Sequence, residues 1–162
     1  MKEISLILKE LRKASGKIKS VEVKRLVDGI IHAKKIYVEG KGRSGYMAAS
    51  FNMRLKHLGL KLTNKPGKND LAIIISGSGR TKETLRKVKK LKGKTKIFCI
   101  TMDKNSPVAR QSDFVVMIQA KKSRQPLRSL FEQETLLLLD AIIIKLMKNL
   151  KISEKEMWRR HD

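Results

Sequence analysis

Residues 71–81, Leu-Ala-Ile-Ile-Ile-Ser-Gly-Ser-Gly-Arg-Thr, contain the pattern that decides the fold. The apolar run 71–75 is followed at once by a glycine-serine turn and then by a helix-like segment. This order is typical of a buried strand in a parallel α/β sheet. Glycines let the backbone approach a ligand, and the helix start offers free N–H groups. The turn therefore predicts a phosphate site, to which the hydroxyls of Ser76, Ser78 and Thr81 can add hydrogen bonds.

A second turn of the same kind, Gly-Lys-Gly-Arg-Ser-Gly at residues 40–45, follows the apolar run 36–38. Two such turns on one sheet predict a phosphorylated small molecule bound between them. Ser44 is then a candidate ligand contact, although an N-cap is the commonest role of serine at a helix start. Arg43 is a candidate partner for phosphate or for a second subunit, and its simpler role is that of a solvated surface cation.

Strand patterns alternate with helix patterns along the rest of the chain. We expect strands at 36–39, 71–75, 96–101 and 114–118. We expect helices at 4–11, 20–32, 44–58, 81–92, 106–111, 130–149 and 153–161. This alternation predicts a three-layer, doubly wound parallel sheet of four to five strands, flavodoxin-like, that binds ligands at the carboxyl ends of its strands. We expect one domain over residues 1–162, with N-terminal helices at 1–33, an α/β core at 34–150 and a C-terminal helix at 151–162.

The composition limits the class of protein. Among 162 residues there is a single cysteine, Cys99, and it lies inside the apolar run 97–100, so we interpret it as a core residue. Because one cysteine cannot form a disulfide within the chain, we expect the protein in the reducing environment of the cytoplasm. We find no signal peptide and no apolar run long enough to span a bilayer, since the run 136–146 is broken by Asp140 and Lys145. No cluster of His, Cys and carboxylate residues has metal-ligand spacing.

The net charge of +23 attracts anions of every kind, including nucleic acid. The basic stretch 82–96 carries eight Lys and Arg side chains, but no aromatic residue interleaves them and no nucleic-acid-binding motif is present. We therefore expect no specific nucleic-acid partner and no membrane partner, and we interpret the charge as a field that favours phosphorylated metabolites.

The two turns, Phe131-Glu132 and the terminal Arg160-His161 occur in an order and at separations that resemble the sugar isomerase (SIS) domain. Within that domain the chain is most similar to the 6-phospho-3-hexuloisomerases, from about Leu26 to His161. The resemblance implies an isomerase that interconverts 3-hexulose 6-phosphate and fructose 6-phosphate through an enediol, without metal or cofactor. It also implies a cytoplasmic homotetramer of the ribulose monophosphate pathway, and the long apolar helix 131–150 independently favours a homo-oligomer.

The resemblance assigns roles to individual residues. Glu132 would be the catalytic base, and His161 would transfer hydroxyl protons in its own or a neighbouring subunit's site. The candidate substrate and phosphate contacts are Gly42, Arg43, Ser44, Ser76, Gly77, Ser78, Arg80 and Thr81. Two alternatives stay open: Ser129 and Glu132 also match a helix capping box, and a terminal histidine is commonly a surface residue. His57, at the end of a helix, is more simply a cation that suits the helix dipole.

The chain departs from the family pattern in two places. Relatives have a further strand and a Gly-Glu-Thr-rich loop where residues 61–68 look shortened, so one strand is expected to be reduced or absent. Residues 127–130 replace a segment that is usually small and threonine-rich. Two alternatives follow: a non-catalytic sugar-phosphate sensor, and an SIS isomerase acting on another sugar phosphate such as arabinose 5-phosphate or sedoheptulose 7-phosphate.

Overall fold

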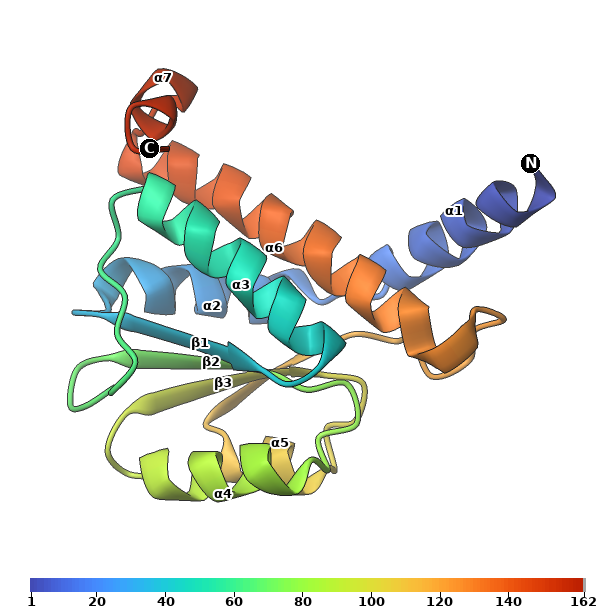
Figure 1. Ribbon diagram of the computed structural model, residues 1–162, viewed down its shortest axis with the longest axis horizontal. Coiled ribbons are helices and arrows are strands. Elements are labelled where there is room, and N and C mark those ends of the chain that lie inside the picture. The colour runs from blue at the N-terminus through green and yellow to red at the C-terminus, as the bar shows by residue number, and fades with distance from the viewer. Residues whose placement is uncertain (162) are drawn as a thin grey trace.

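The computed structural model describes residues 1–161 and contains one parallel sheet with the strand order β1-β2-β3-β4. The strands are β1 (Ile36–Gly40), β2 (Leu71–Ile75), β3 (Lys96–Thr101) and β4 (Phe114–Met117). One face is covered by α2 (Ser20–His32), α3 (Arg43–His57) and α6 (Ser129–Leu150), and the other by α4 (Lys82–Leu91) and α5 (Pro107–Gln111) (Figure 1). The expected three-layer α/β architecture is confirmed.

The core divides according to the alternation of side chains along the strands. Ile36, Val38, Ile73 and Ile75 point to the layer of α2, α3 and α6, which holds the larger apolar cluster. Their neighbours in sequence point the other way, to Val88 and Val108 on α4 and α5. Cys99 belongs to this second cluster, and burial raises the pKa of its thiol to about 12, so its role as a core residue is confirmed.

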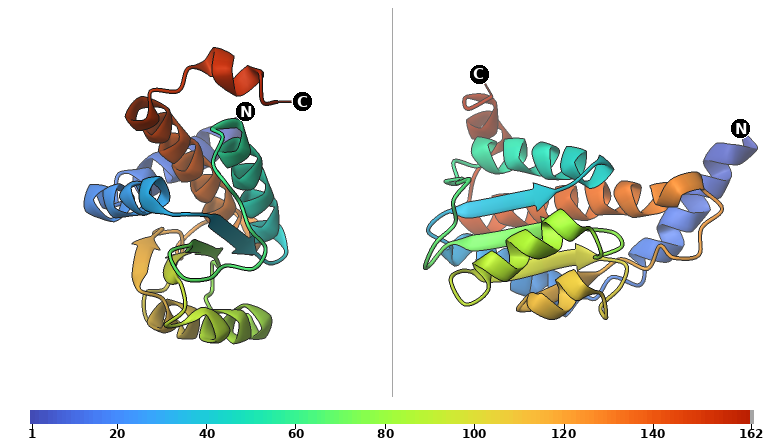
Figure 2. Two further views of the ribbon diagram at one scale, coloured as in Figure 1. Left: turned by 90° about the vertical axis from the view of Figure 1, so that its left-hand side faces the viewer. Right: turned by 60° about the horizontal axis from the view of Figure 1, so that its bottom comes forward.

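The connection between β1 and β2 explains why α3 and α4 lie on opposite faces of the sheet (Figure 2). After α3, Leu62 forms a single parallel bridge with Ile36 on the outer edge of β1, where the Ile36 amide donates to the Lys61 carbonyl. A right-handed crossover from β1 to this bridge moves toward one edge of the sheet and places α3 on one face. The crossovers that start from β2 move toward the other edge, so their helices lie on the opposite face. This is the flavodoxin-like strand order with its second strand reduced to one bridge. The expected loss at residues 61–68 is confirmed.

The remaining elements differ from the expected ones mainly at their ends. The first helix, α1 (Lys2–Ser15), runs past Leu11, and its N-terminal part projects beyond the body of the molecule (Figure 1). A 3-10 turn, η1 (Pro126–Arg128), precedes α6. The last helix, α7 (Glu154–Trp158), opens with a capping box formed by Ser153 and Glu156 but ends before His161. No helix within residues 1–161 is long and apolar enough to cross a membrane.

Glu134 is a carboxylate buried between α6 and α1, with 1% of its surface exposed. Burial raises its pKa, and the hydrogen bond that Ser15 Oγ donates to it at 2.8 Å only partly offsets this. A carboxyl whose folded-state pKa lies above its unfolded value costs stability as the pH rises through that window. We expect Glu134→Gln to raise Tm by about 3 °C at pH 8, which corresponds to ~1 kcal/mol at this chain length, and to leave Tm unchanged at pH 4. An equal shift at both pH values, by differential scanning calorimetry, would exclude this explanation.

Candidate functional site

The carboxyl ends of β1 and β2 open onto a cavity of about 150 Å³. It lies where the chain leaves β1 toward one face of the sheet and leaves β2 toward the other, which is where α/β sheets bind ligands. Both glycine-serine turns contribute to its wall, together with η1 and the start of α6. The lining residues are Lys41, Ser44, Ile75, Ser76, Gly77, Ser78, Thr81, Met102, Leu127, Arg128, Phe131 and Glu132. Six of the ten candidate site residues are therefore brought together.

The turn after β2 is held rigidly by the layers around it. The Gly77 carbonyl accepts hydrogen bonds from the Met102 amide and from Thr101 Oγ1, and the Gly79 carbonyl accepts one from Val108. Gly79 has φ +61°, and a Cβ there would lie 2.0 Å from Ser106 Oγ, so only glycine fits. This packing fixes the direction of the turn's hydroxyl and amide groups before any ligand binds.

Two helix N-termini at the cavity lack side-chain caps. Thr81 precedes α4 and Gly42 precedes α3, and neither receives a capping bond from its helix. Except for the Gly45 amide, which donates to the Gly42 carbonyl, the first amides of each helix keep their hydrogen-bonding capacity, and each helix presents a positive dipole end at the cavity. Ser44 lies inside α3 rather than at its N-cap, so the capping alternative is wrong, and its buried side chain lines the cavity instead.

Glu132 provides the carboxylate of the site. Its Oε2 lies 3.2 Å from Arg43 Nη2, and this oxygen is buried without an aligned hydrogen bond, so the contact is an ion pair that leaves a lone pair available. The Ser129–Glu132 capping box is not formed, because Ser129 is the first residue of α6 and Arg128 occupies the N-cap position. The carboxylate of Glu132 is therefore not used in a helix cap, and the residue remains in the wall of the cavity.

Arg43 also ties down the strained entry to α6. Leu127 and Arg128 both have positive φ, 51° and 66°, an uncommon conformation for side chains of this size. Arg43 donates to the Leu127 carbonyl and, at 3.3 Å, to Ser129 Oγ. Arg43 thus links the first turn to the segment that carries Glu132, rather than standing free in solvent. Lys41 and Arg128 line the cavity as well, although no sequence pattern singled them out.

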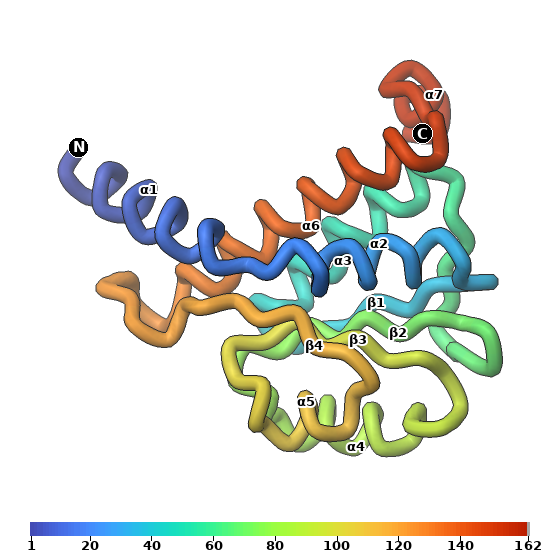
Figure 3. The backbone as a smooth tube through the Cα atoms, turned by 180° about the vertical axis from the view of Figure 1, so that it is seen from behind, coloured from blue at the N-terminus to red at the C-terminus, as the bar shows by residue number. Residues whose placement is uncertain are grey.

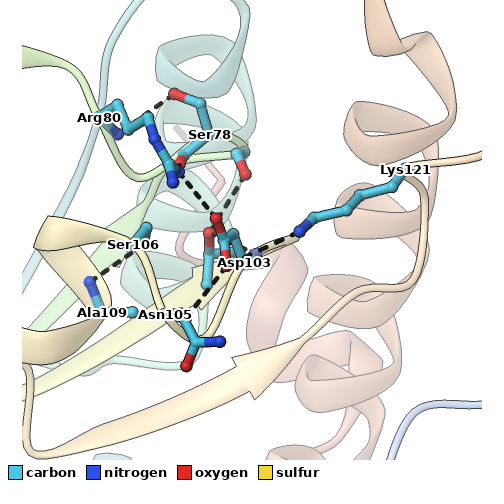
Figure 4. Close-up of polar contacts among 9 residues, drawn as sticks. Ser78, Arg80, Asp103, Asn105, Ser106, Ala109 and Lys121 are labelled. Carbon is cyan, nitrogen blue, oxygen red and sulfur yellow. Dashed lines mark hydrogen bonds and ion pairs between the residues drawn. The ribbon is translucent and has the colours of Figure 1, made fainter.

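Two candidate residues lie away from the cavity. Arg80 turns to Asp103, with Nη1 2.8 Å from Oδ2, while Lys121 Nζ approaches the other oxygen at 3.7 Å (Figure 4). The hydrogen bond from Arg80 lowers the pKa of Asp103. Arg80 is therefore a clamp between the turn and the loop after β3, and its role as a direct phosphate contact stays a prediction.

His161 lies at the opposite end of the molecule from the cavity. The C-terminus and α7 are at the far end of α6 from η1 (Figures 1 and 3). There the His161 ring lies 5.0 Å from that of His57 and 5.1 Å from that of Trp158, measured between centroids. Burial, together with the nearby His161 and Arg54, lowers the pKa of His57. Within one chain, His161 cannot reach the cavity.

The hydroxyl groups of the cavity give a first binding prediction. The Ser76→Ala, Thr81→Val double variant is expected to weaken binding of inorganic phosphate about tenfold, since hydrogen bonds to charged groups are among the stronger ones. Phosphate titration followed by NMR would measure this. Thr63→Val, which removes a hydroxyl on an exposed loop outside the cavity, serves as the control. Equal affinity for the wild type and the double variant would place phosphate elsewhere.

The comparisons with known proteins agree with this geometry. The SIS domain family model matches residues 64–145, and the chain belongs to this family. A protein of Methanocaldococcus jannaschii, named 3-hexulose-6-phosphate isomerase, is 40% identical over 84% of this chain and 80% of its own length. A protein of Bacillus subtilis with the same name is 36% identical over 98% and 95% of the two chains.

A solved structure adds evidence of the same kind. The crystal structure of a Methanococcus jannaschii protein, described as inferring a molecular function of 3-hexulose-6-phosphate isomerase, superposes with a TM-score of 0.89. It is 35% identical and covers 100% of this chain and 98% of its own. The match to the Bacillus relative spans 177 positions, more than the 162 residues of this chain, so the relative carries residues that this chain lacks.

Proposed function

We propose that this protein is a ketose-phosphate isomerase that interconverts 3-hexulose 6-phosphate and fructose 6-phosphate. The observation that carries the proposal is that the carboxylate-bearing Glu132 lines the same cavity as the starts of two helices that lack side-chain caps. The helix N-termini suit a phosphate dianion, and the carboxylate of Glu132 can act as the proton acceptor. The names of the Methanocaldococcus and Bacillus relatives support the choice of substrate.

In the proposed mechanism the turn after β2 holds the phosphate, with Ser76, Ser78 and Thr81 as hydroxyl partners. Binding at this remote group positions the sugar carbons against the carboxylate. Glu132 removes the proton bound to C3 of fructose 6-phosphate, and the C2 carbonyl oxygen gains a proton, which gives the 2,3-enediol. Glu132 then returns its proton to C2, while the C3 hydroxyl loses its proton and becomes the new carbonyl.

Charge in the site supports this sequence. Arg43 lies beside Glu132, where its guanidinium would stabilise negative charge that develops on the enediolate oxygens. Lys41 and Arg128 in the cavity wall add positive charge for the phosphate. Ser44 is placed to meet a sugar hydroxyl. Neither a metal nor a cofactor has a step to perform in this mechanism.

We further propose a homo-oligomer, and a tetramer as its form. Large apolar side chains are left exposed on the outer layer of helices: Tyr46, Met53, Leu137, Ile144 and Trp158. Contiguous exposed apolar surface marks an interaction site, and a second copy offers the same surface in return. A partner is also needed if His161 is to act in proton transfer, because within its own chain it lies at the far end of α6.

Sedimentation velocity tests the oligomer directly. The wild type is expected to sediment as a tetramer, and the Leu137→Lys, Ile144→Lys double variant as a smaller species, because lysines desolvated at this interface would be unpaired. The control is Lys89→Glu, Lys90→Glu, which alters exposed charge on α4, away from this layer. A monomeric wild type would contradict the proposal.

A second candidate, a non-catalytic sugar-phosphate sensor, rests on the shortened segment 61–68, where a strand is reduced to a single bridge at Leu62. A substrate panel separates the candidates: fructose 6-phosphate, arabinose 5-phosphate and sedoheptulose 7-phosphate, each incubated with the protein and assayed for its isomer. We expect conversion of fructose 6-phosphate alone, consistent with a cytoplasmic enzyme of the ribulose monophosphate pathway. Binding of all three without conversion would support the sensor.

A further inference from the structure

A second and larger cavity lies beside the first, between α1 and the loops that follow β3 and β4. Its volume is about 420 Å³, within the range of small-molecule sites. Met102 belongs to the walls of both cavities. The lining residues are Glu10, Lys13, Ala14, Lys17, Met102, Asp103, Lys104, Asn105, Met117, Gln119, Lys121, Lys122 and Leu130.

The two acidic residues of this second cavity are already satisfied by protein groups. Asp103 is paired with Arg80 and Lys121 (Figure 4). Glu10 accepts hydrogen bonds from the Arg124 amide, Ser123 Oγ and Gln125 Nε2, and these bonds lower its pKa. Both carboxylates stay ionised, but the wall remains net positive, because five lysines line it against two acids.

The remaining cations have no acidic partner. Among the ion pairs of residues 1–161, none includes Lys13, Lys17, Lys104 or Lys122. Four lysine side chains around one cavity carry more positive charge than a single phosphate dianion would balance. They come from three separate segments, the end of α1, the loop after β3 and the loop after β4, so the fold rather than a local charge run brings them together.

The floor of the second cavity is apolar and its rim carries amides. Ala14, Met102 and Leu130 are each no more than 3% exposed, so the half-buried Met117 offers most of the apolar surface on which a flat ring can pack. Asn105 and Gln119 are exposed at the cavity and can pair with the donor and acceptor edge of a heterocycle. A ligand that matches both parts has a flat polar ring and several phosphate charges.

We propose that the second cavity binds a nucleoside di- or triphosphate, with its phosphates at the lysines and its base on the floor. The ligand is distinct from the proposed substrate and does not depend on the isomerase assignment. Because Arg80 joins the turn after β2 to Asp103 in the wall of this cavity, occupancy has a direct structural route to the proposed phosphate site (Figure 4).

Isothermal titration calorimetry with ATP and ADP at physiological salt tests the proposal. Lys13→Gln, Lys122→Gln is expected to weaken ATP binding about tenfold, since it removes two charged hydrogen-bond donors. The matched control is Lys89→Gln, Lys90→Gln, which makes the same change of net charge on α4 and is expected to bind as the wild type does. Equal weakening by both double variants would show that only the general field of the +23 chain attracts the nucleotide.

Two further titrations locate the ligand. Inorganic triphosphate is expected to bind at least about tenfold more weakly than ATP, because it makes no contact with the apolar floor. Saturating fructose 6-phosphate is expected not to displace ATP. Equal affinity for triphosphate and ATP, or full displacement by the sugar phosphate, would overturn the proposal. Glu132→Gln should leave ATP binding unchanged, so a failure of the isomerase assignment would not be mistaken for a failure here.

Discussion

Glu132→Gln is expected to lower kcat for fructose 6-phosphate about a thousandfold and to change KM little, because an amide cannot take a proton but fills the same space. The half-buried position keeps the side chain at the cavity in either form, although the ion pair with Arg43 is lost in the Gln variant. Steady-state rates with a coupled assay would measure the loss.

Glu134→Gln is the matched control for that experiment. It makes the same chemical change two residues along α6, but Glu134 is bonded to Ser15 on α1 and does not line the cavity. Full activity of Glu134→Gln together with loss in Glu132→Gln would assign the base. Comparable activity in both variants would mean that another group takes the proton.

The second large effect is structural. Gly40→Ala is expected to cost about 3 kcal/mol or more of unfolding free energy, because a Cβ there would lie 2.4 Å from the Ser44 carbonyl oxygen and 2.9 Å from the Gly45 amide nitrogen. Both are backbone atoms of the turn into α3, so no side chain can move aside to relieve the clash. The first wall of the cavity would have to shift.

Gly93→Ala is the comparison for this prediction. It also replaces a turn glycine, at φ +76°, but a Cβ there meets no atom within 4 Å. Its cost is expected to be about 1 kcal/mol from the positive φ alone. Urea unfolding of the three proteins would rank them, and a Gly40→Ala variant as stable as Gly93→Ala would show that the turn is looser than the structure describes.

Much of the fold could be predicted from local pattern. The runs before Gly40 and Ser76 are short, β-branched and followed by glycine, which leaves few alternatives to parallel strands. The reduced strand at Leu62 could be expected from the short segment 61–68 in light of the family resemblance. The ends of α1 and α7 were less predictable, because packing against α6 and local capping decide where a helix stops.

The site was predictable only in part, for a physical reason. Local spacing gave Ser44 and Glu132 two roles each, and the observed helix starts decide between them: α3 begins before Ser44, and α6 begins at Ser129. The partner of the Glu132 carboxylate, Arg43, lies 89 residues earlier in the chain. Arg80 has the right position in sequence for a phosphate contact, yet Asp103 holds it elsewhere. No pattern near residue 161 indicates that His57 will be its neighbour.

The second cavity shows the same limit more strongly. Its lysines lie at residues 13, 17, 104 and 122, and nothing in their local sequence relates them. In a chain with 38 Lys and Arg residues, each is unremarkable until the fold places them around an apolar floor. The overall charge predicts that the protein attracts anions. Only the tertiary structure predicts which part of the surface binds one class of anion in preference to others.

Hydrogen exchange at C3 distinguishes isomerisation through an enediol across C2 and C3 from every alternative considered above. Fructose 6-phosphate is incubated with the protein in deuterated water, and the carbon-bound hydrogens are followed by NMR. The account predicts loss of the C3 hydrogen signal and the appearance of the 3-ketose. Exchange at C1 instead would indicate an aldose–ketose isomerase, and no exchange despite saturable binding of the sugar phosphate would contradict an isomerase role and favour a sensor.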